Sequence, residues 1–143
     1  MCMPSRLAKL FLLLAALSQF ALSQASPAPN STPDPHSVPS LDGGLGPCTA
    51  DFVITDKDNK PVYNAKVKVH IAYGFMNLHK LDLEVDTNVD GKARFTGLPN
   101  RLKRGLNFEA SEGNRSGVAF DDPSQTCQKQ FAITLRKGGQ PIE

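Results

Sequence analysis

Residues 60–73 read KPVYNAKVKVHIAY, and their second half shows the pattern on which the fold depends. Apolar residues occupy every second position there, namely Val67, Val69, Ile71 and Tyr73. The residues between them are Lys66, Lys68, His70 and Ala72. Because side chains on a strand alternate between its two faces, this period of two predicts a strand with one buried face and one face in water.

The same alternation recurs from residue 48 to residue 135. Strands are expected at 48–55, 66–73, 81–86, 106–111 and 127–135, with weaker ones at 93–96 and 117–120. Turn sequences such as Asp90-Gly91 separate them, and no long window keeps a helical period. About seven short strands are typical of an antiparallel two-sheet β-sandwich of the immunoglobulin-like kind.

Length and composition place one such domain in the chain. The sequence has 143 residues, of which 40% are hydrophobic and 21% charged, as in an ordinary globular protein. This length excludes a tandem-domain enzyme, and the single long apolar run excludes a polytopic membrane protein. We expect the β-sandwich domain at residues 48–137 and a flexible tail at 138–143.

The first 25 residues have the features of a secretory signal peptide. Arg6 and Lys9 precede an apolar run that begins at Leu10, and Ser23 and Ala25 are small residues suited to cleavage before residue 26. A secreted protein is therefore expected, extracellular or periplasmic. The alternative is an uncleaved anchor, for which the apolar run is short, since a bilayer span needs about 20 residues.

Removing the signal peptide changes the charge balance. The full chain carries 16 basic and 14 acidic residues, but residues 1–25 hold two of the basic ones and none of the acidic ones, so the remainder has 14 of each. We expect no nucleic-acid partner and no membrane contact after signal cleavage. The one tight basic cluster, Arg101, Lys103 and Arg104, is interpreted as a solvated turn, with a phosphate or polyanion role as the alternative.

Residues 26–47 differ in composition from the rest. Six of these 22 residues are Pro, four are Ser and three are Gly, so the segment has little apolar surface to offset the entropy cost of ordering. We expect a disordered linker. Asn30 begins a glycosylation sequon, as does Asn114, and both are candidate modification sites if the host glycosylates exported proteins.

The cysteines are expected to form one disulfide. Cys2 leaves with the signal peptide, and the remaining Cys48 and Cys127 both share the parity of the apolar positions in their strands. In an oxidising compartment they should pair. A metal-binding or reactive thiol is the rival interpretation, but the sequence has no Cys-x-x-Cys and no His within four residues of either cysteine.

Two stretches carry a resemblance to a known family. Residues 60–71 read KPVYNAKVKVHI, and residues 86–99 read DTNVDGKARFTGLP. The Pro-Val strand start, the Gly-containing turn before a strand and the following Leu-Pro resemble the carboxypeptidase regulatory-like domain, over about residues 50–135. That resemblance implies a transthyretin-like β-sandwich that serves as a non-catalytic accessory or binding module. The sequence departs from the family after Pro99.

Enzymes with related folds were weighed as alternatives. The transthyretin-related hydrolases of urate breakdown end in Tyr-Arg-Gly-Ser, whereas residues 137–143 here read KGGQPIE. Intradiol dioxygenases hold iron with two Tyr and two His, for which Tyr63, Tyr73, His70 and His79 are the candidates. His70 and Tyr73 have opposite strand parity, so we expect them on opposite faces. We therefore predict a protein that is not an enzyme and has no cofactor.

One half of a calcium-binding loop is present. Asp86, Asn88 and Asp90 precede Gly91 with the spacing of the first half of such a loop, but its twelfth position, normally Glu, is Gly97. A polar hairpin turn is the favoured interpretation, and calcium remains the alternative. No metal site is predicted beyond these weak candidates.

The expected function is binding or structural. Protein contact is favoured over carbohydrate contact because the chain has no Trp, which leaves Tyr63 or Phe75 as stacking platforms. The expected partner is another exported protein or a cell-surface polymer. The alternative is a small secreted hydrolase or a metal-dependent enzyme, for which the His, Tyr and acidic side chains would have to converge in one pocket.

Overall fold

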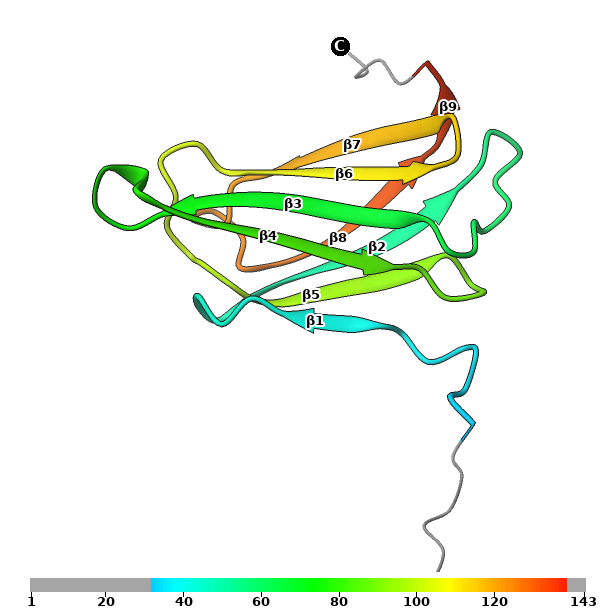
Figure 1. Ribbon diagram of the computed structural model, residues 1–143, viewed down its shortest axis with the longest axis horizontal. Coiled ribbons are helices and arrows are strands. Elements are labelled where there is room, and N and C mark those ends of the chain that lie inside the picture. Colours follow the sequence, from blue (N-terminus) through cyan, green and yellow to red (C-terminus); the bar gives the residue numbers. More distant parts are fainter. Residues whose placement is uncertain (1–31, 139–143) are drawn as a thin grey trace, which may run out of the picture. The chain divides into compact units, whose positions relative to one another are not determined.

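A computed structural model describes residues 32–138 (Figure 1). The predicted signal peptide, Asn30 and residues 139–143 of the predicted tail lie outside these residues. All strands belong to the compact unit that begins at Pro33. Within residues 32–138, no helix is both long enough and apolar enough to cross a membrane.

Strands occupy all seven predicted segments. In chain order the elements are β1 (Ser40–Asp42), β2 (Cys48–Thr55), β3 (Lys66–Tyr73), the one-turn helix η1 (Phe75–Asn77), β4 (His79–Asp86), β5 (Lys92–Leu98), β6 (Leu106–Glu112), β7 (Arg115–Asp121), β8 (Gln128–Thr134) and β9 (Arg136–Lys137). The short strands β1 and β9 were not predicted. In β3 the burial alternates as the sequence predicts, with Val67, Val69 and Ile71 inside.

The strands form two sheets, which confirms the predicted β-sandwich (Figure 1). One sheet has four strands in the order β1-β5-β2-β8, and the other has five in the order β4-β3-β6-β7-β9. The five-stranded sheet is antiparallel as expected, but in the four-stranded sheet β1 pairs with β5, and β2 with β8, in parallel. The segment after β7 crosses to the four-stranded sheet, where Gln128 at the start of β8 lies opposite Thr49 near the start of β2.

Aromatic rings fill the space between the sheets. Phe52 of β2 contacts Phe95, Phe108 and Phe131, with ring centroids 4.8 to 5.8 Å apart. These four rings come from both sheets and are at most 8% exposed. They therefore join β2, β5 and β8 to β6 through one apolar core.

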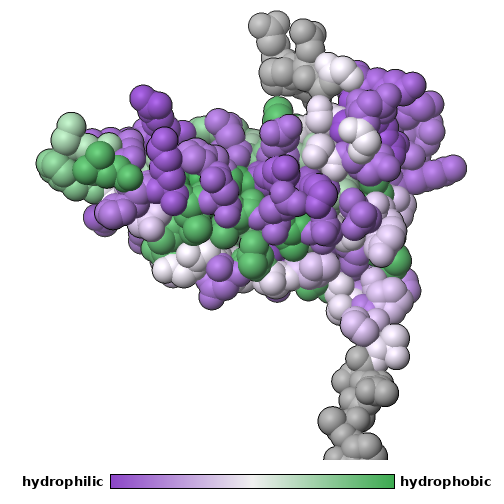
Figure 2. Space-filling view, viewed as in Figure 1, coloured by the Kyte–Doolittle hydropathy of each residue, from purple (hydrophilic) through white to green (hydrophobic). Residues whose placement is uncertain are grey.

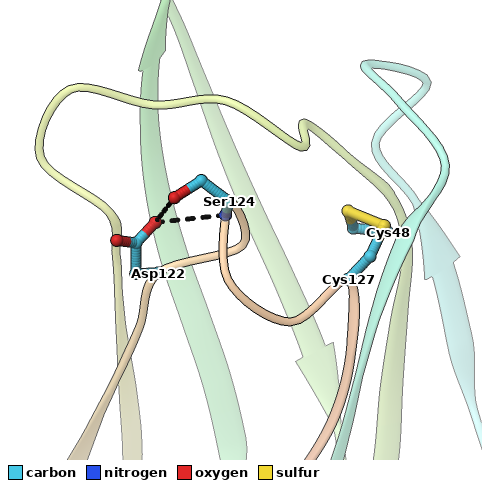
Figure 3. The surroundings of a disulfide bond; sticks show 4 residues. All are labelled: Cys48, Asp122, Ser124 and Cys127. Carbon is cyan, nitrogen blue, oxygen red and sulfur yellow. Dashed lines mark hydrogen bonds between the residues drawn. A yellow bond between two sulfur atoms is a disulfide. The ribbon is translucent and has the colours of Figure 1, made fainter.

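The predicted disulfide between Cys48 and Cys127 is confirmed (Figure 3). The two cysteines are 79 residues apart in sequence, and they join the start of β2 to the residue before β8. The backbone N–H of Thr49 also donates to the carbonyl of Cys127 at 2.8 Å. The bond thus holds together the beginnings of two neighbouring parallel strands.

The prediction of a disordered linker over residues 26–47 is wrong for its second part. Residues 40–42 form β1 along the edge of β5, and the carbonyl of Gly97 accepts hydrogen bonds from Leu45 and Gly46. Gly97 has φ +65°, and a side chain there would collide with Asp42. Composition did not indicate this order because it includes main-chain hydrogen bonds, which act together with the core contacts of Leu41 and Leu45.

Lys129 breaks the alternation of β8 for a structural reason. Its Nζ lies 3.4 Å from Oδ1 of Asp121, a carboxylate that is almost completely buried, and 5.2 Å from the ring centroid of Phe131. β8 is the edge strand of its sheet. Lys129 itself is exposed, and a charged residue at an inward-parity position of an edge strand disfavours the addition of a foreign strand.

Candidate binding surfaces

The outer face of the five-stranded sheet carries a row of side chains in register. Glu84 of β4 lies opposite Lys68 of β3, Lys68 opposite Glu109 of β6, and Glu109 opposite Val118 of β7. Alternation directs all four away from the core, and together with His70 and Asn107 they line a shallow groove. We name this row and its flanking residues the sheet face.

Charged side chains on one half of the sheet face neutralise each other. Lys66 Nζ donates to Glu84 at 2.6 Å and to Asp86 at 3.3 Å, and Lys68 lies 3.2 Å from Glu84. The hydrogen bond to Glu84 raises the pKa of Lys66, and the hydrogen bond from Lys66 lowers the pKa of Glu84. Nδ1 of His70 is within hydrogen-bond distance of Asp82.

On the other half of the sheet face, which we name the unpaired half, the carboxylate of Glu109 has no partner of opposite charge among the described residues. Beside it, Val118 and Phe120 are 54% and 56% exposed. An unpaired carboxylate next to two exposed apolar side chains suits contact with a group that is both cationic and apolar.

A second surface is the loop between β3 and β4, residues 74–78, which we name the apolar tip. Phe75, Met76 and Leu78 are 81%, 71% and 73% exposed. The loop projects from one end of the sandwich, and Figure 2 shows the same region as a cluster of hydrophobic atoms. The sequence singled out only Phe75 here, as a stacking platform. The sequence feature that could have indicated the apolar tip is the presence of three large apolar residues in a turn segment that starts with Gly74.

The predicted basic cluster lies at the same end of the sandwich, in the loop that joins β5 to β6. Arg104 of this cluster lines a hollow together with Lys80 of β4 and Met76 of the apolar tip. Arg101, Lys103 and Arg104 form no ion pair with any described residue, and neither does Lys80. Cations therefore flank the apolar tip without compensating carboxylates.

The three weak calcium candidates each have a separate role. Asp86 pairs with Lys66, and Asp90 Oδ2 lies 3.0 Å from His36 Nδ1. Asn88 is buried, and its Oδ1 accepts hydrogen bonds from the backbone N–H groups of Asp90 and Lys92 at 3.0 and 2.9 Å. Among residues 32–138, no three His, Cys, Asp or Glu side chains are grouped so that they could hold a metal ion.

The four iron candidates are not brought together. Tyr73 and His79 stack with ring centroids 5.4 Å apart at one end of β3. Tyr63 lies before the other end of this strand, which is roughly 25 Å long, and is 65% exposed. His70 faces outward, as its parity predicts, and pairs with Asp82.

The second glycosylation candidate is accessible. Asn114 lies with Gly113 in the turn between β6 and β7, and both residues are exposed. This is the kind of surface loop in which a modified sequon is found. Modification at Asn114 stays a prediction.

Comparison with known proteins extends only to the fold. No protein-family model matches the sequence, and no curated protein matches it. A 3-chlorocatechol 1,2-dioxygenase from Rhodococcus opacus 1CP is similar in structure, with TM-score 0.46 and 12% identity over 74% of this chain and 65% of that one. A catechol 1,2-dioxygenase from Acinetobacter sp. ADP1, inhibited by bound mercury, has TM-score 0.42 and 12% identity over 71% and 59%.

A catechol 1,2-dioxygenase from Acinetobacter radioresistens gives similar values, with TM-score 0.41 and 14% identity over 73% of this chain and 64% of that one. The chain thus spans less than two thirds of each of these three dioxygenases.

Proposed function

We propose that this protein is an exported, non-catalytic β-sandwich module that acts by binding another exported protein. The observation that carries the proposal is the unpaired half of the sheet face. There Val118 and Phe120 are exposed beside Glu109, which forms no ion pair with any residue in 32–138. Apolar groups with a polar rim are typical of non-obligate protein interfaces. The partner's complementary chemistry is an Arg or Lys next to an apolar side chain.

The distribution of reactive side chains supports binding over catalysis. An enzyme would gather its acid, base or metal ligands in one pocket. Here Tyr63 and Tyr73 lie toward opposite ends of β3, and His70 is paired on the sheet face. The resemblance to carboxypeptidase regulatory-like domains points to the same role, and export rests on the signal peptide predicted at residues 1–25.

Protein contact is favoured over sugar contact by the side chains available. The sheet face offers a single aromatic ring, Phe120, and its polar groups are largely engaged with each other. A sugar site would need a stacking platform surrounded by free hydrogen-bonding groups. An Arg or Lys next to an apolar side chain, which would complement Glu109, Val118 and Phe120, is found on proteins rather than on sugars.

The test is to cross-link the exported chain in the cells that produce it and to measure how much partner protein is recovered with the wild type and with each variant. We expect V118E/F120E to recover about tenfold less partner, the loss expected from removing an apolar anchor. The matched control is A132E, which puts a carboxylate on an exposed position of the other sheet. Equal retention by the wild type and V118E/F120E would contradict a protein-binding sheet face.

A further inference from the structure

The apolar tip is held in one conformation by its backbone. Gly74, Met76 and Asn77 have φ values of +80°, +53° and +56°, in the left-handed region that Met adopts rarely. The N–H of Asn77 donates to the carbonyl of Gly74, and that of Leu78 to the carbonyl of Phe75. These constraints present large apolar side chains to solvent in a fixed arrangement.

The base of the tip is fixed as well. The ring of His79 stacks on Tyr73, and a Cβ on Gly74 would lie 2.7 Å from His79 Cδ2. Only glycine fits there, both for its φ and for the close approach of the ring. The tip therefore projects from a rigid support, and a surface that binds it has little ordering entropy to overcome.

Four basic side chains near the tip form no ion pair with any residue in 32–138. Lys80 and Arg104 line a hollow with Met76, and Arg101 and Lys103 lie on the same loop as Arg104. Carboxylates at this end of the sandwich are engaged elsewhere. Asp42 accepts from the N–H of Gly44, Asp121 pairs with Lys129, and Asp122 accepts from Ser124 and Gln125. Asp82 of β4 pairs with His70, which lines the same hollow.

We propose that this end of the domain docks on the surface of an anionic lipid bilayer. Phe75, Met76 and Leu78 would enter the boundary between headgroups and acyl chains, and the four cations would contact lipid phosphates. Apolar side chains flanked by Lys and Arg are the chemistry of interfacial membrane binding. This departs from the expectation that the chain has no membrane contact after its signal peptide is removed.

The shape of the surface favours a bilayer over the other occupants. A bilayer accepts a protruding apolar tip anywhere on its surface, whereas a protein partner needs a matching apolar socket. A soluble polyanion would use the cations alone and leave the three apolar side chains in water. A second copy of this end would place the two sets of cations against each other.

The test is cosedimentation of the exported chain with vesicles. We expect it to bind vesicles that contain about 30% phosphatidylglycerol, and to bind pure phosphatidylcholine about tenfold more weakly. Raising the salt from about 0.1 to about 0.5 M should weaken the binding, because it screens the contacts between cations and phosphates. The variant F75S/M76S/L78S should bind the anionic vesicles about tenfold more weakly than the wild type, and so should R101S/K103S/R104S.

Controls separate this proposal from protein binding at the sheet face. V118E/F120E should bind vesicles as the wild type does, even if it loses its protein partner. The three tip side chains are mostly exposed, so F75S/M76S/L78S should melt as the wild type does. Three results would each overturn the proposal: equal binding to both kinds of vesicle, undiminished vesicle binding by F75S/M76S/L78S, or a protein partner lost by this variant with no vesicle binding by the wild type.

Discussion

The two ends of the sandwich are held by different means (Figure 1). At the end with the disulfide, one covalent bond joins Cys48 to Cys127, while the side chains of the nearby apolar tip are mostly exposed and the four cations form no ion pair with any residue in 32–138. At the opposite end, polar side chains satisfy one another. Where a disulfide joins two strands, the side chains of the neighbouring loops are not needed to hold that end together and can point into solvent. Where hydrogen bonds hold an end together, its polar side chains are used within the fold.

Asn88 and Thr87 are the centre of the hydrogen-bonded end. Asn88 Nδ2 donates to the carbonyls of His36 and Ser37 at 2.9 and 3.1 Å. The hydroxyl of Thr87 accepts from the N–H of Ala65 and donates to the carbonyl of Val62. These two buried side chains tie the turn after β4 to two segments that are distant in sequence.

The largest effect is expected from breaking the disulfide. A bond that closes a loop of 79 residues stabilises by up to about 4–5 kcal/mol, chiefly by restricting the unfolded chain. We expect Cys127→Ser to lower the melting temperature by more than about 10 °C. The control is Thr126→Ala, an exposed neighbour. Two free thiols in the unfolded wild-type mature chain, or an unchanged melting temperature in Cys127→Ser, would contradict the expectation.

A smaller loss is expected from Asn88→Ala. The substitution removes four hydrogen bonds and leaves partly buried backbone groups without their Asn88 partner, which should lower the free energy of unfolding by about 2–4 kcal/mol. Denaturant titration measures this loss, and limited proteolysis should show faster cleavage within residues 33–39. Asn107→Ala, on the exposed face of β6, is the matched control. A loss no larger than that control would mean that Asn88 does not hold the segment.

The smallest effect is a pH dependence at the same end. The hydrogen bond with Asp90, together with its negative charge, raises the pKa of His36 above its ordinary value of 6.5. Because the folded pKa is the higher one, this contribution is complete below about pH 6.5 and is lost as the pH rises through the folded pKa. Cleavage within residues 33–39 should therefore be slower at about pH 5.5 than at about pH 8.

Proton NMR titration of His36 measures this shift directly. Asp90→Asn should return the midpoint toward the ordinary value, because it removes the charge of the partner. An identical midpoint in the wild type and in Asp90→Asn would show that the pairing does not form in solution.

The sandwich could be predicted because its signal is local. In residues 66–71 each apolar side chain follows a polar one, and this period indicates a strand with one buried face wherever it lies in the fold. Parity and the predicted compartment were also enough to pair Cys48 with Cys127. The edge strand β1 could not be predicted, since its order comes from main-chain contacts with β5, which composition does not report.

The binding surfaces depended on contacts that are not local. Alternation shows that Val118 and Phe120 share a face, but it does not show which face is buried. Pairing with β6 decides this, because Ala119 lies opposite the buried Phe108 and must also point inward. The sequence alone thus determined the strands and the disulfide, through local periodicity and cysteine parity. The tertiary structure decided which apolar side chains remain in water, because burial depends on what lies opposite each residue.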